Sequence, residues 1–227
     1  MLGRREAGLG AYRDVRDDGR PTEDDAARRA SPRPARLMRP AIFFDRDGTL
    51  NEEVGYAGRA EDFHIFPVAP AAVRRVNQAG LAAVVITNQA GIARGLFPES
   101  AVETLHTLLR ARLDAAGARL DAVYYCPHHP EGPVPAYTRV CDCRKPQPGM
   151  LRRAARELDL DLAASWVVGD RRMDVAVAHA VGARAVLVKT GYGARELADG
   201  DVLAAQPDAI ADDALAAVRA ILRQDPR

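Results

Sequence analysis

The chain has 227 residues, a length that fits one α/β domain with a short appendage. Its formal net charge of +1 creates no overall attraction toward DNA or an acidic membrane. Hydrophobic residues make up 48% and charged residues 28%, no apolar run approaches the ~20 residues needed to cross a bilayer, and the N-terminus lacks the apolar stretch of a secretory signal. Only three cysteines are present, which fits a reducing compartment, so we expect a cytoplasmic protein without a nucleic-acid or membrane partner.

Residues 1–40 differ in composition from the rest of the chain. They mix Arg, Asp, Ala and Pro with few large apolar side chains, and such a segment buries too little apolar surface to offset the entropy of ordering it. We predict an N-terminal extension that is disordered or loosely packed, with a short helix at residues 23–29 as the alternative. Residues 41–222 then form the folded domain.

From residue 41 onward, short apolar runs alternate with amphipathic segments. The runs are rich in Val, Ile and aromatic residues and predict strands at residues 41–44, 81–87, 121–126, 165–169 and 183–189. The amphipathic segments predict helices at residues 68–80, 100–117, 149–160 and 173–182, the second of them capped by Ser100 with Glu103 completing a capping box. This alternation predicts an α/β fold with a doubly wound, Rossmann-like parallel sheet.

Polar and charged side chains follow several of the predicted strands, where α/β sheets carry their chemistry. These side chains are Asp45 and Asp47 after the first strand, Thr87 and Asn88 after the second, Arg144 and Lys145 before the fourth, and Asp170 and Asp174 after it. Converging carboxylates need a cation, and an all-oxygen site suits Mg²⁺. The cations and the hydroxyl suit anionic oxygens, so the set predicts a phosphoryl-transfer site, although the chain has no P-loop.

All three cysteines lie in one loop, residues 126–143. A disulfide is disfavoured because Cys141 and Cys143 are too close to pair comfortably and one cysteine would be left over. A catalytic thiol is not needed if Asp45 is the nucleophile. Together with His128, the cysteines form a Cys₃His set that suits tetrahedral Zn²⁺, although the spacings are shorter than in most zinc fingers and idle thiols stay the alternative.

Four ordered segments resemble the motifs of the haloacid dehalogenase superfamily of phosphatases: DRDGTL at residues 45–50, TNQ at 87–89, Lys145, and GDRRMD at 169–174. The resemblance implies that Asp45 is the nucleophile and Asp47 the general acid and base. Thr87 and Lys145 would hold the phosphoryl oxygens. Mg²⁺ would bind the Asp45 carboxylate, the Asp47 backbone carbonyl and Asp170, while Asp174 would orient Lys145 or the metal waters.

The segments YYCPHHPEG and VCDCRKPQPGM, with DRDGTLNEEVGY and TNQAGIARG, resemble a narrower group, the D-glycero-D-manno-heptose 1,7-bisphosphate phosphatases. This resemblance implies no large cap domain and a zinc loop whose ligands are Cys126, His128, Cys141 and Cys143. It implies substrate contacts at Arg46, Glu53, Val54, Gly55, Tyr56, Asn88, Gln89, Ala90, Arg144 and Arg171. We expect Arg144 to read a distal phosphate, and Arg171 replaces the lysine associated with its position. We interpret the zinc as a device that holds Arg144 and Lys145 over the phosphate site.

The expected function is Mg²⁺-dependent hydrolysis of the C7 phosphate of a heptose 1,7-bisphosphate, in nucleotide-activated heptose synthesis for surface glycans, by a monomer acting on a small phosphorylated sugar. One alternative is a histidinol-phosphate phosphatase, which would offer acid groups such as Glu52, Glu53 or Asp62 to the substrate amine. A second is a polynucleotide 3′-phosphatase, but the net charge gives no sign of a basic groove. A zinc-stabilised interaction module would require a missing nucleophile or acid, and both aspartates are present.

Overall fold

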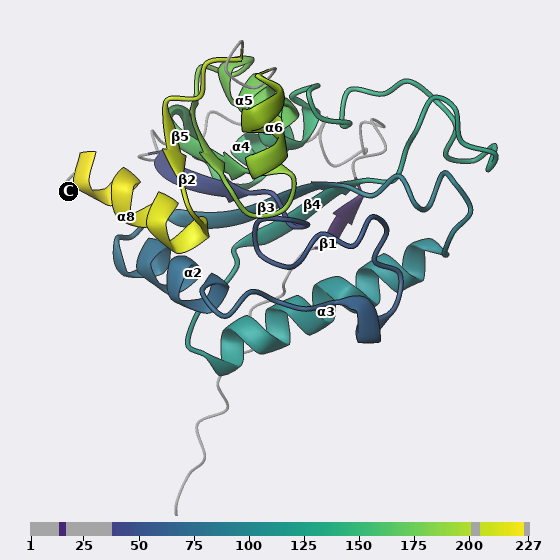
Figure 1. Ribbon diagram of the computed structural model, residues 1–227, viewed down its shortest axis with the longest axis horizontal. Helices are drawn as coiled ribbons and strands as arrows, with labels where there is room; N and C mark the ends of the chain where they lie inside the picture. Colours follow the sequence, from purple (N-terminus) through teal and green to yellow (C-terminus); the bar gives the residue numbers. More distant parts are fainter. Residues whose placement is uncertain (1–13, 17–37, 201–204, 225–227) are drawn as a thin grey trace, which may run out of the picture.

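The computed structural model describes residues 14–16, 38–200 and 205–224, which form a parallel sheet with helices on both faces (Figure 1). The strand order is β1-β4-β3-β2-β5-β6-β7, and every neighbouring pair is parallel. The strands are β1 (Asp14–Arg16), β2 (Arg39–Phe44), β3 (Ala82–Asn88), β4 (Ala122–Cys126), β5 (Leu160–Gly169), β6 (Arg184–Val188) and β7 (Ala209–Ala211). The predicted doubly wound α/β fold is confirmed.

Two layers of helices cover the sheet. One face carries α2 (Ala69–Gln78), α3 (Glu99–Ala115) and α8 (Ala214–Gln224), and the other carries α4 (Gly149–Leu158), α5 (Arg172–His179) and α6 (Gly193–Asp199) (Figure 1). Residues 45–68 and 127–148 are the long connections of the described chain, and the one short helix that they carry is the 3-10 helix η1 (Ala60–Asp62). Within the described residues, neither connection builds a large cap domain.

The alternation of side chains along the strands divides the core into two halves. Ile42 and Phe44 are fully buried in the cluster beneath α2, α3 and α8, whereas Phe43 is fully buried in the cluster beneath α4 and α5. The apolar runs of the sequence are near-continuous because both faces of these strands are covered.

Three predicted element boundaries differ from the structure in ways that have a clear local cause. Helix α3 begins at Glu99 after an extended Pro98, with no side-chain hydrogen bond at the cap, so Ser100 lies inside the first turn and forms no capping box. Helix α4 ends at Leu158 because Asp159 adopts a left-handed conformation with φ of 54°, and β5 then begins at Leu160 instead of residue 165.

Several elements were not predicted. Strand β1 lies within the segment expected to be an extension and pairs with β4 at the edge of the sheet, while β7, α6 and α8 complete the C-terminal part. The alternative helix at residues 23–29 lies outside the described residues, and most of residues 1–40 do too. In the described part of the chain, no helix has the length and apolar character needed to cross a membrane.

Candidate active site

Strands β3 and β4 lie on one side of β2 in the sheet, and β5, β6 and β7 lie on the other, so the strand order reverses at β2. The site lies at this point. Strand β2 pairs with β3 on one side and with β5 on the other, so the carboxyl ends of three adjacent strands meet at one edge. Asp45 follows β2, Thr87 lies near the end of β3, and Asp170 follows β5. A crevice outside such a switch point is where α/β sheets bind ligands.

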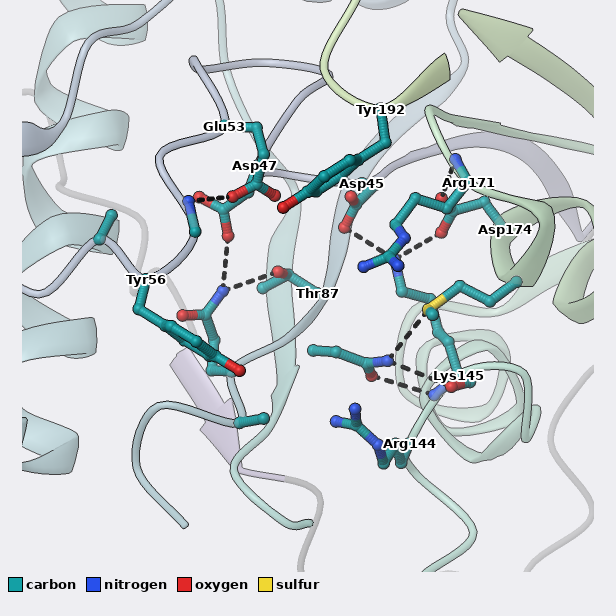
Figure 2. Close-up of a pocket in the computed structure, with 16 residues that line it drawn as sticks. Asp45, Asp47, Glu53, Tyr56, Thr87, Arg144, Lys145, Arg171, Asp174 and Tyr192 are labelled. Atoms are coloured by element: carbon teal, nitrogen blue, oxygen red, sulfur yellow. Dashed lines mark hydrogen bonds and ion pairs between the residues drawn. The ribbon is translucent and has the colours of Figure 1, made fainter. Parts of the chain in front are cut away.

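A buried lysine links two of the aspartates. Lys145 Nζ lies 2.7 Å from Asp45 Oδ1 and 2.6 Å from Asp174 Oδ1 (Figure 2). It also donates to the Ile86 carbonyl at 3.0 Å. Burial lowers the pKa of Lys145, but the carboxylates of Asp174 and Asp45 outweigh it, so the net shift is upward. The lysine is therefore a permanent cation beside Asp45, as binding of anionic oxygens requires.

Asp170 is buried where two glycine-containing loops meet. Its Oδ2 accepts the Tyr192 backbone N–H at 2.7 Å, while no hydrogen-bond partner for Oδ1 lies among the described residues. A Cβ at Gly48 or at Gly191 would come within 2.2 Å of Asp170 Oδ2, and both glycines have positive φ. Only glycine therefore allows these loops to enclose the carboxylate.

The carboxylates of Asp45, Asp170 and Asp174 fit a divalent cation. One oxygen from each lies within 4.8 Å of the others. Burial raises the pKa of Asp45 to about 7 and that of Asp170 to about 9, the latter with further contributions from the charges of Asp45 and Asp174. A hard cation would reverse both shifts and would supply the partner that Asp170 Oδ1 lacks in the described chain. The donor set is all oxygen, as Mg²⁺ prefers.

Asp47 is held by a dense set of donors. Its carboxylate accepts hydrogen bonds from Asn51 Nδ2 at 2.9 Å, from Gln89 Nε2 at 2.8 Å, and from the guanidinium of Arg46 at distances down to 2.8 Å. Burial raises the pKa of Asp47, but the Arg46 charge and these hydrogen bonds outweigh it and lower the pKa overall. Gln89 Nε2 also donates to Thr87 Oγ1 at 2.9 Å, so it joins the carboxylate to the hydroxyl.

Arg46 was expected to contact substrate, but its side chain faces away from the pocket. It is fully buried, and its guanidinium also lies 3.2 Å from His106 Nε2 and 3.1 Å from Gln89 Oε1. A residue after Asp45 in an extended chain points to the opposite side from Asp45 and Asp47. Its side chain therefore supports Asp47 from the interior of the protein and does not belong to the pocket lining, so its contact with substrate stays a prediction.

Replacing Arg46 with methionine should lower the free energy of unfolding by about 3 kcal/mol, because the change leaves a mostly buried carboxylate without its counter-ion. It should also raise the pKa of Asp47. Chemical denaturation of the two proteins measures the first effect. The control is Arg59→Met, which removes an exposed ion pair with Glu61 and should leave the unfolding midpoint unchanged. Equal midpoints for Arg46→Met and wild type would contradict the supporting role.

The pocket contains most of the residues that the sequence singled out. Its lining consists of Asp45, Asp47, Glu53, Gly55, Tyr56, Ala57, Thr87, Asn88, Gln89, Ala90, Arg144, Lys145, Arg171, Met173, Asp174 and Tyr192 (Figure 2). Val54 is not in this lining, and its side chain is exposed. The sequence did not single out Ala57, Met173 or Tyr192.

Tyr192 and Arg171 form one wall of this pocket. The Arg171 guanidinium lies 4.7 Å from the centre of the Tyr192 ring, and its Nε lies 3.5 Å from Glu196 Oε1. A planar guanidinium stacks on an aromatic face, which an ammonium group does less well. Stacking on the Tyr192 ring therefore favours an arginine at position 171.

The expected zinc ligands converge in the loop after β4. The Sγ atom of Cys143 lies 3.2 Å from those of Cys126 and Cys141, and His128 Nδ1 lies 3.2 Å from Cys143 Sγ. These separations exceed a disulfide bond and approach the ~3.8 Å edge of a tetrahedron of thiolates around zinc. His129, in contrast, turns away and accepts a hydrogen bond from Glu131 N.

The ionisation of the three thiols also fits a metal. The hydrogen bond with Cys141 raises the pKa of Cys126 to about 12, and hydrogen bonds with Cys126 and Cys141 raise that of Cys143. Hydrogen bonds with Cys126 and Cys143 lower the pKa of Cys141. A bound Zn²⁺ would stabilise all three thiolates with one neutral histidine, which is a closed structural set.

Comparisons with known proteins agree with this geometry. A family profile described as HAD-hydrolase-like matches residues 142–217. The chain is 49% identical over 154 residues to the D-glycero-beta-D-manno-heptose-1,7-bisphosphate 7-phosphatase of Escherichia coli K12, covering 67% of this chain and 80% of that protein. It is 48% identical over 186 residues to the D-glycero-D-manno-heptose-1,7-bisphosphate 7-phosphatase of Thermosynechococcus vestitus, covering 80% and 95%.

Solved structures give the same result. The D,D-heptose 1,7-bisphosphate phosphatase of B. bronchiseptica, complexed with magnesium and phosphate, superposes with a TM-score of 0.73 at 33% identity over 82% of this chain and 99% of that one. The D,D-heptose 1,7-bisphosphate phosphatase of Burkholderia thailandensis superposes with a TM-score of 0.59 at 31% identity, covering 81% and 99%.

Proposed function

The chain belongs to the family of D-glycero-D-manno-heptose-1,7-bisphosphate 7-phosphatases within the haloacid dehalogenase superfamily, and on that premise we propose that it hydrolyses the C7 phosphate of such a heptose bisphosphate. The observation that carries the proposal is the grouping of cations in one pocket. Lys145 lies against Asp45, and Arg144 and Arg171 line the same pocket. One phosphate would bind at Asp45 and the second at the arginines.

In the first step a carboxylate oxygen of Asp45 attacks phosphorus, the bond from phosphorus to the sugar oxygen breaks, and an aspartyl-phosphate forms. Lys145 and Thr87 bind the phosphoryl oxygens as charge develops on them. Asp47 gives a proton to the departing sugar oxygen. Because its donors lower its pKa, Asp47 must take up this proton when the dianionic phosphate binds nearby.

In the second step Asp47 takes a proton from water, and the oxygen of that water attacks phosphorus. The bond between phosphorus and Asp45 breaks, which releases phosphate and restores both carboxyl groups. The hydrogen bonds from Arg46, Asn51 and Gln89 favour the ionised Asp47 that this step needs.

Two metals are part of the proposal. Mg²⁺ would be held by the carboxylates of Asp45 and Asp170 with the backbone carbonyl of Asp47, and it would neutralise negative charge between substrate and carboxylates. Asp174 bonds to Lys145 and would orient it. Zn²⁺ would be held by Cys126, His128, Cys141 and Cys143 as a structural ion. The B. bronchiseptica relative, whose structure contains magnesium and phosphate, supports the first assignment.

The pocket favours a bisphosphate over histidinol phosphate. Of the acid groups that could receive an amine, Glu53 lines the pocket, whereas Glu52 and Asp62 do not belong to its lining. Glu53 Oε1 already accepts the Gly55 backbone N–H at 2.5 Å. The pocket lining therefore offers two arginines, Arg144 and Arg171, but only one of these three acid groups, Glu53. This balance suits a second phosphate better than an amine. The relatives do not favour a polynucleotide substrate or an inactive module.

Replacing Arg144 or Arg171 with methionine should lower kcat/KM for the heptose bisphosphate roughly 10–100-fold, since a charge-assisted contact to the distal phosphate is lost. Hydrolysis of p-nitrophenyl phosphate, which has no second phosphate, should change little. The exposed Arg75→Met is the matched control. Steady-state kinetics on both heptose bisphosphate anomers and on histidinol phosphate test the substrate itself, and equal or better turnover of histidinol phosphate by the wild type would overturn the proposal.

The cytoplasmic location and the monomeric state stay predictions. The first rests on free cysteines grouped in a metal-type cluster, as expected in a reducing compartment. Gel filtration with light scattering tests the second.

A further inference from the structure

Asn88 ends strand β3 and lines the pocket, but its side chain is bonded to the main chain of the catalytic lysine. Its Oδ1 accepts the Lys145 backbone N–H at 3.0 Å, and its Nδ2 donates to the Lys145 carbonyl at 3.1 Å. We propose that Asn88 is a positioning residue, which holds the backbone of Lys145 so that the ammonium group reaches Asp45. This inference rests on the proposed function, because Lys145 must act on the phosphoryl group for its position to matter.

The hydrogen-bonding capacity of Asn88 is largely used inside the protein. A carboxamide has two N–H donors, and Nδ2 donates to the Lys145 carbonyl and lies 3.4 Å from Met173 Sδ. The oxygen receives the Lys145 N–H. Few atoms of this side chain are left to bind substrate. The place of Asn88 in the pocket is therefore better explained by its bonds to Lys145 than by the substrate contact that the sequence predicted.

A lysine needs such a support more than most residues. Four rotatable methylenes separate its ammonium group from its backbone, so a shift of the backbone moves Nζ away from its partners. Here Nζ is buried and contacts Asp45, Asp174 and the Ile86 carbonyl together. Productive geometry tolerates displacements of about 0.5 Å, which a loop fixed on one side does not guarantee.

The bonds between Asn88 and Lys145 complete a closed path of contacts that includes the cysteine cluster. Asn88 of β3 is in register with Cys126 of β4, and Gln89 N donates to the Cys126 carbonyl at 2.8 Å. Cys126 and Cys143 are 3.2 Å apart through their sulfurs, and Cys143 is two residues before Lys145. Lys145 is thus held from one side by the cluster and from the other by Asn88.

The test is a double-mutant cycle between Asn88→Ala and Lys145→Met, measured by single-turnover kinetics so that slow variants stay quantifiable. In the wild-type background, Asn88→Ala should lower the rate roughly tenfold with little change in KM. In the Lys145→Met background it should have no further effect, because the group that it positions is gone. Asn88→Asp keeps the acceptor alone and should fall between wild type and Asn88→Ala.

The chain offers a matched control on its other side. Asn77 Oδ1 accepts the Arg119 backbone N–H at 2.8 Å and its Nδ2 donates to the Arg119 carbonyl at 2.9 Å, which is the same pair of bonds far from the site. Asn77→Ala should leave the rate unchanged. Thermal unfolding and zinc content of each variant report folding directly, and Asn88→Asp provides the test if Asn88→Ala fails to fold.

Three results would overturn the inference. An equal loss from Asn88→Ala in both backgrounds would show that Asn88 does not act through Lys145. A raised KM with an unchanged rate would make Asn88 a substrate contact. Full activity of Lys145→Met alone would refute the proposed role of Lys145 and the inference together, whereas the first two results leave the proposed function intact.

Discussion

Replacing Asp45 with asparagine is expected to lower the turnover of the heptose bisphosphate roughly 10⁴-fold or more, to the limit of detection. The change is nearly isosteric, but a neutral amide oxygen is a poor nucleophile and forms no stable phosphorylated product. It also removes the charge that Lys145 meets at 2.7 Å. Steady-state phosphate release measures the loss, and acid-quenched mass spectrometry detects whether a phosphoryl group is attached to the protein.

Asp47→Asn separates the chemistry of Asp45 from a simple loss of charge in the site. With p-nitrophenyl phosphate, whose leaving group needs no proton, this variant should still form the aspartyl-phosphate but should hydrolyse it slowly, because no base activates the water. The phosphorylated protein should then accumulate in Asp47→Asn and be absent from Asp45→Asn. The exposed Asp62→Asn should behave as wild type. Retention of full hydrolysis by Asp45→Asn would refute the covalent mechanism.

The sequence was sufficient to place the carboxylates because their positions depend on local rules. Asp45 follows a strand whose residues are buried on both faces, and parallel strands bring their carboxyl ends to one edge. Asp170 follows β5 for the same reason. Residues that act at the end of a predictable strand are therefore themselves predictable.

Other parts of the site depend on tertiary contacts that no local pattern reveals. Tyr192 supports Asp170 through its backbone N–H, a role that any residue type could supply and that leaves no chemical signature in the sequence. A glycine is needed at position 191 because Asp170 and Gly48 approach it closely, and both of these residues are far from it along the chain. The family resemblance placed Arg46 among the substrate contacts, whereas the alternation of side chains turns it into the interior.

Removing zinc is expected to produce the second largest loss, roughly 10²–10³-fold in kcat/KM. Cys143 is fully buried and immediately precedes Arg144 and Lys145, so replacing it with serine should release the loop that carries both cations. Cys143→Ser should contain no stoichiometric zinc by elemental analysis and should unfold at a lower temperature, since metal binding contributes to folding. Val140→Ser, an exposed change in the same loop, should keep the metal and the activity.

The pattern of the loss distinguishes a structural zinc from a catalytic one. The carboxylates proposed for Mg²⁺ follow β2 and β5, whereas the cysteine cluster joins the end of β4 to the later part of the connection that precedes α4. Zinc-depleted protein should therefore keep its Mg²⁺ affinity but bind inorganic phosphate more weakly, because Lys145 and Arg144 are displaced. Isothermal titration with each ion separates the two sites. Unchanged phosphate affinity in Cys143→Ser would contradict the proposal that zinc holds those two cations over the phosphate. Zinc that persists in Cys141→Ser would contradict the proposed ligand set.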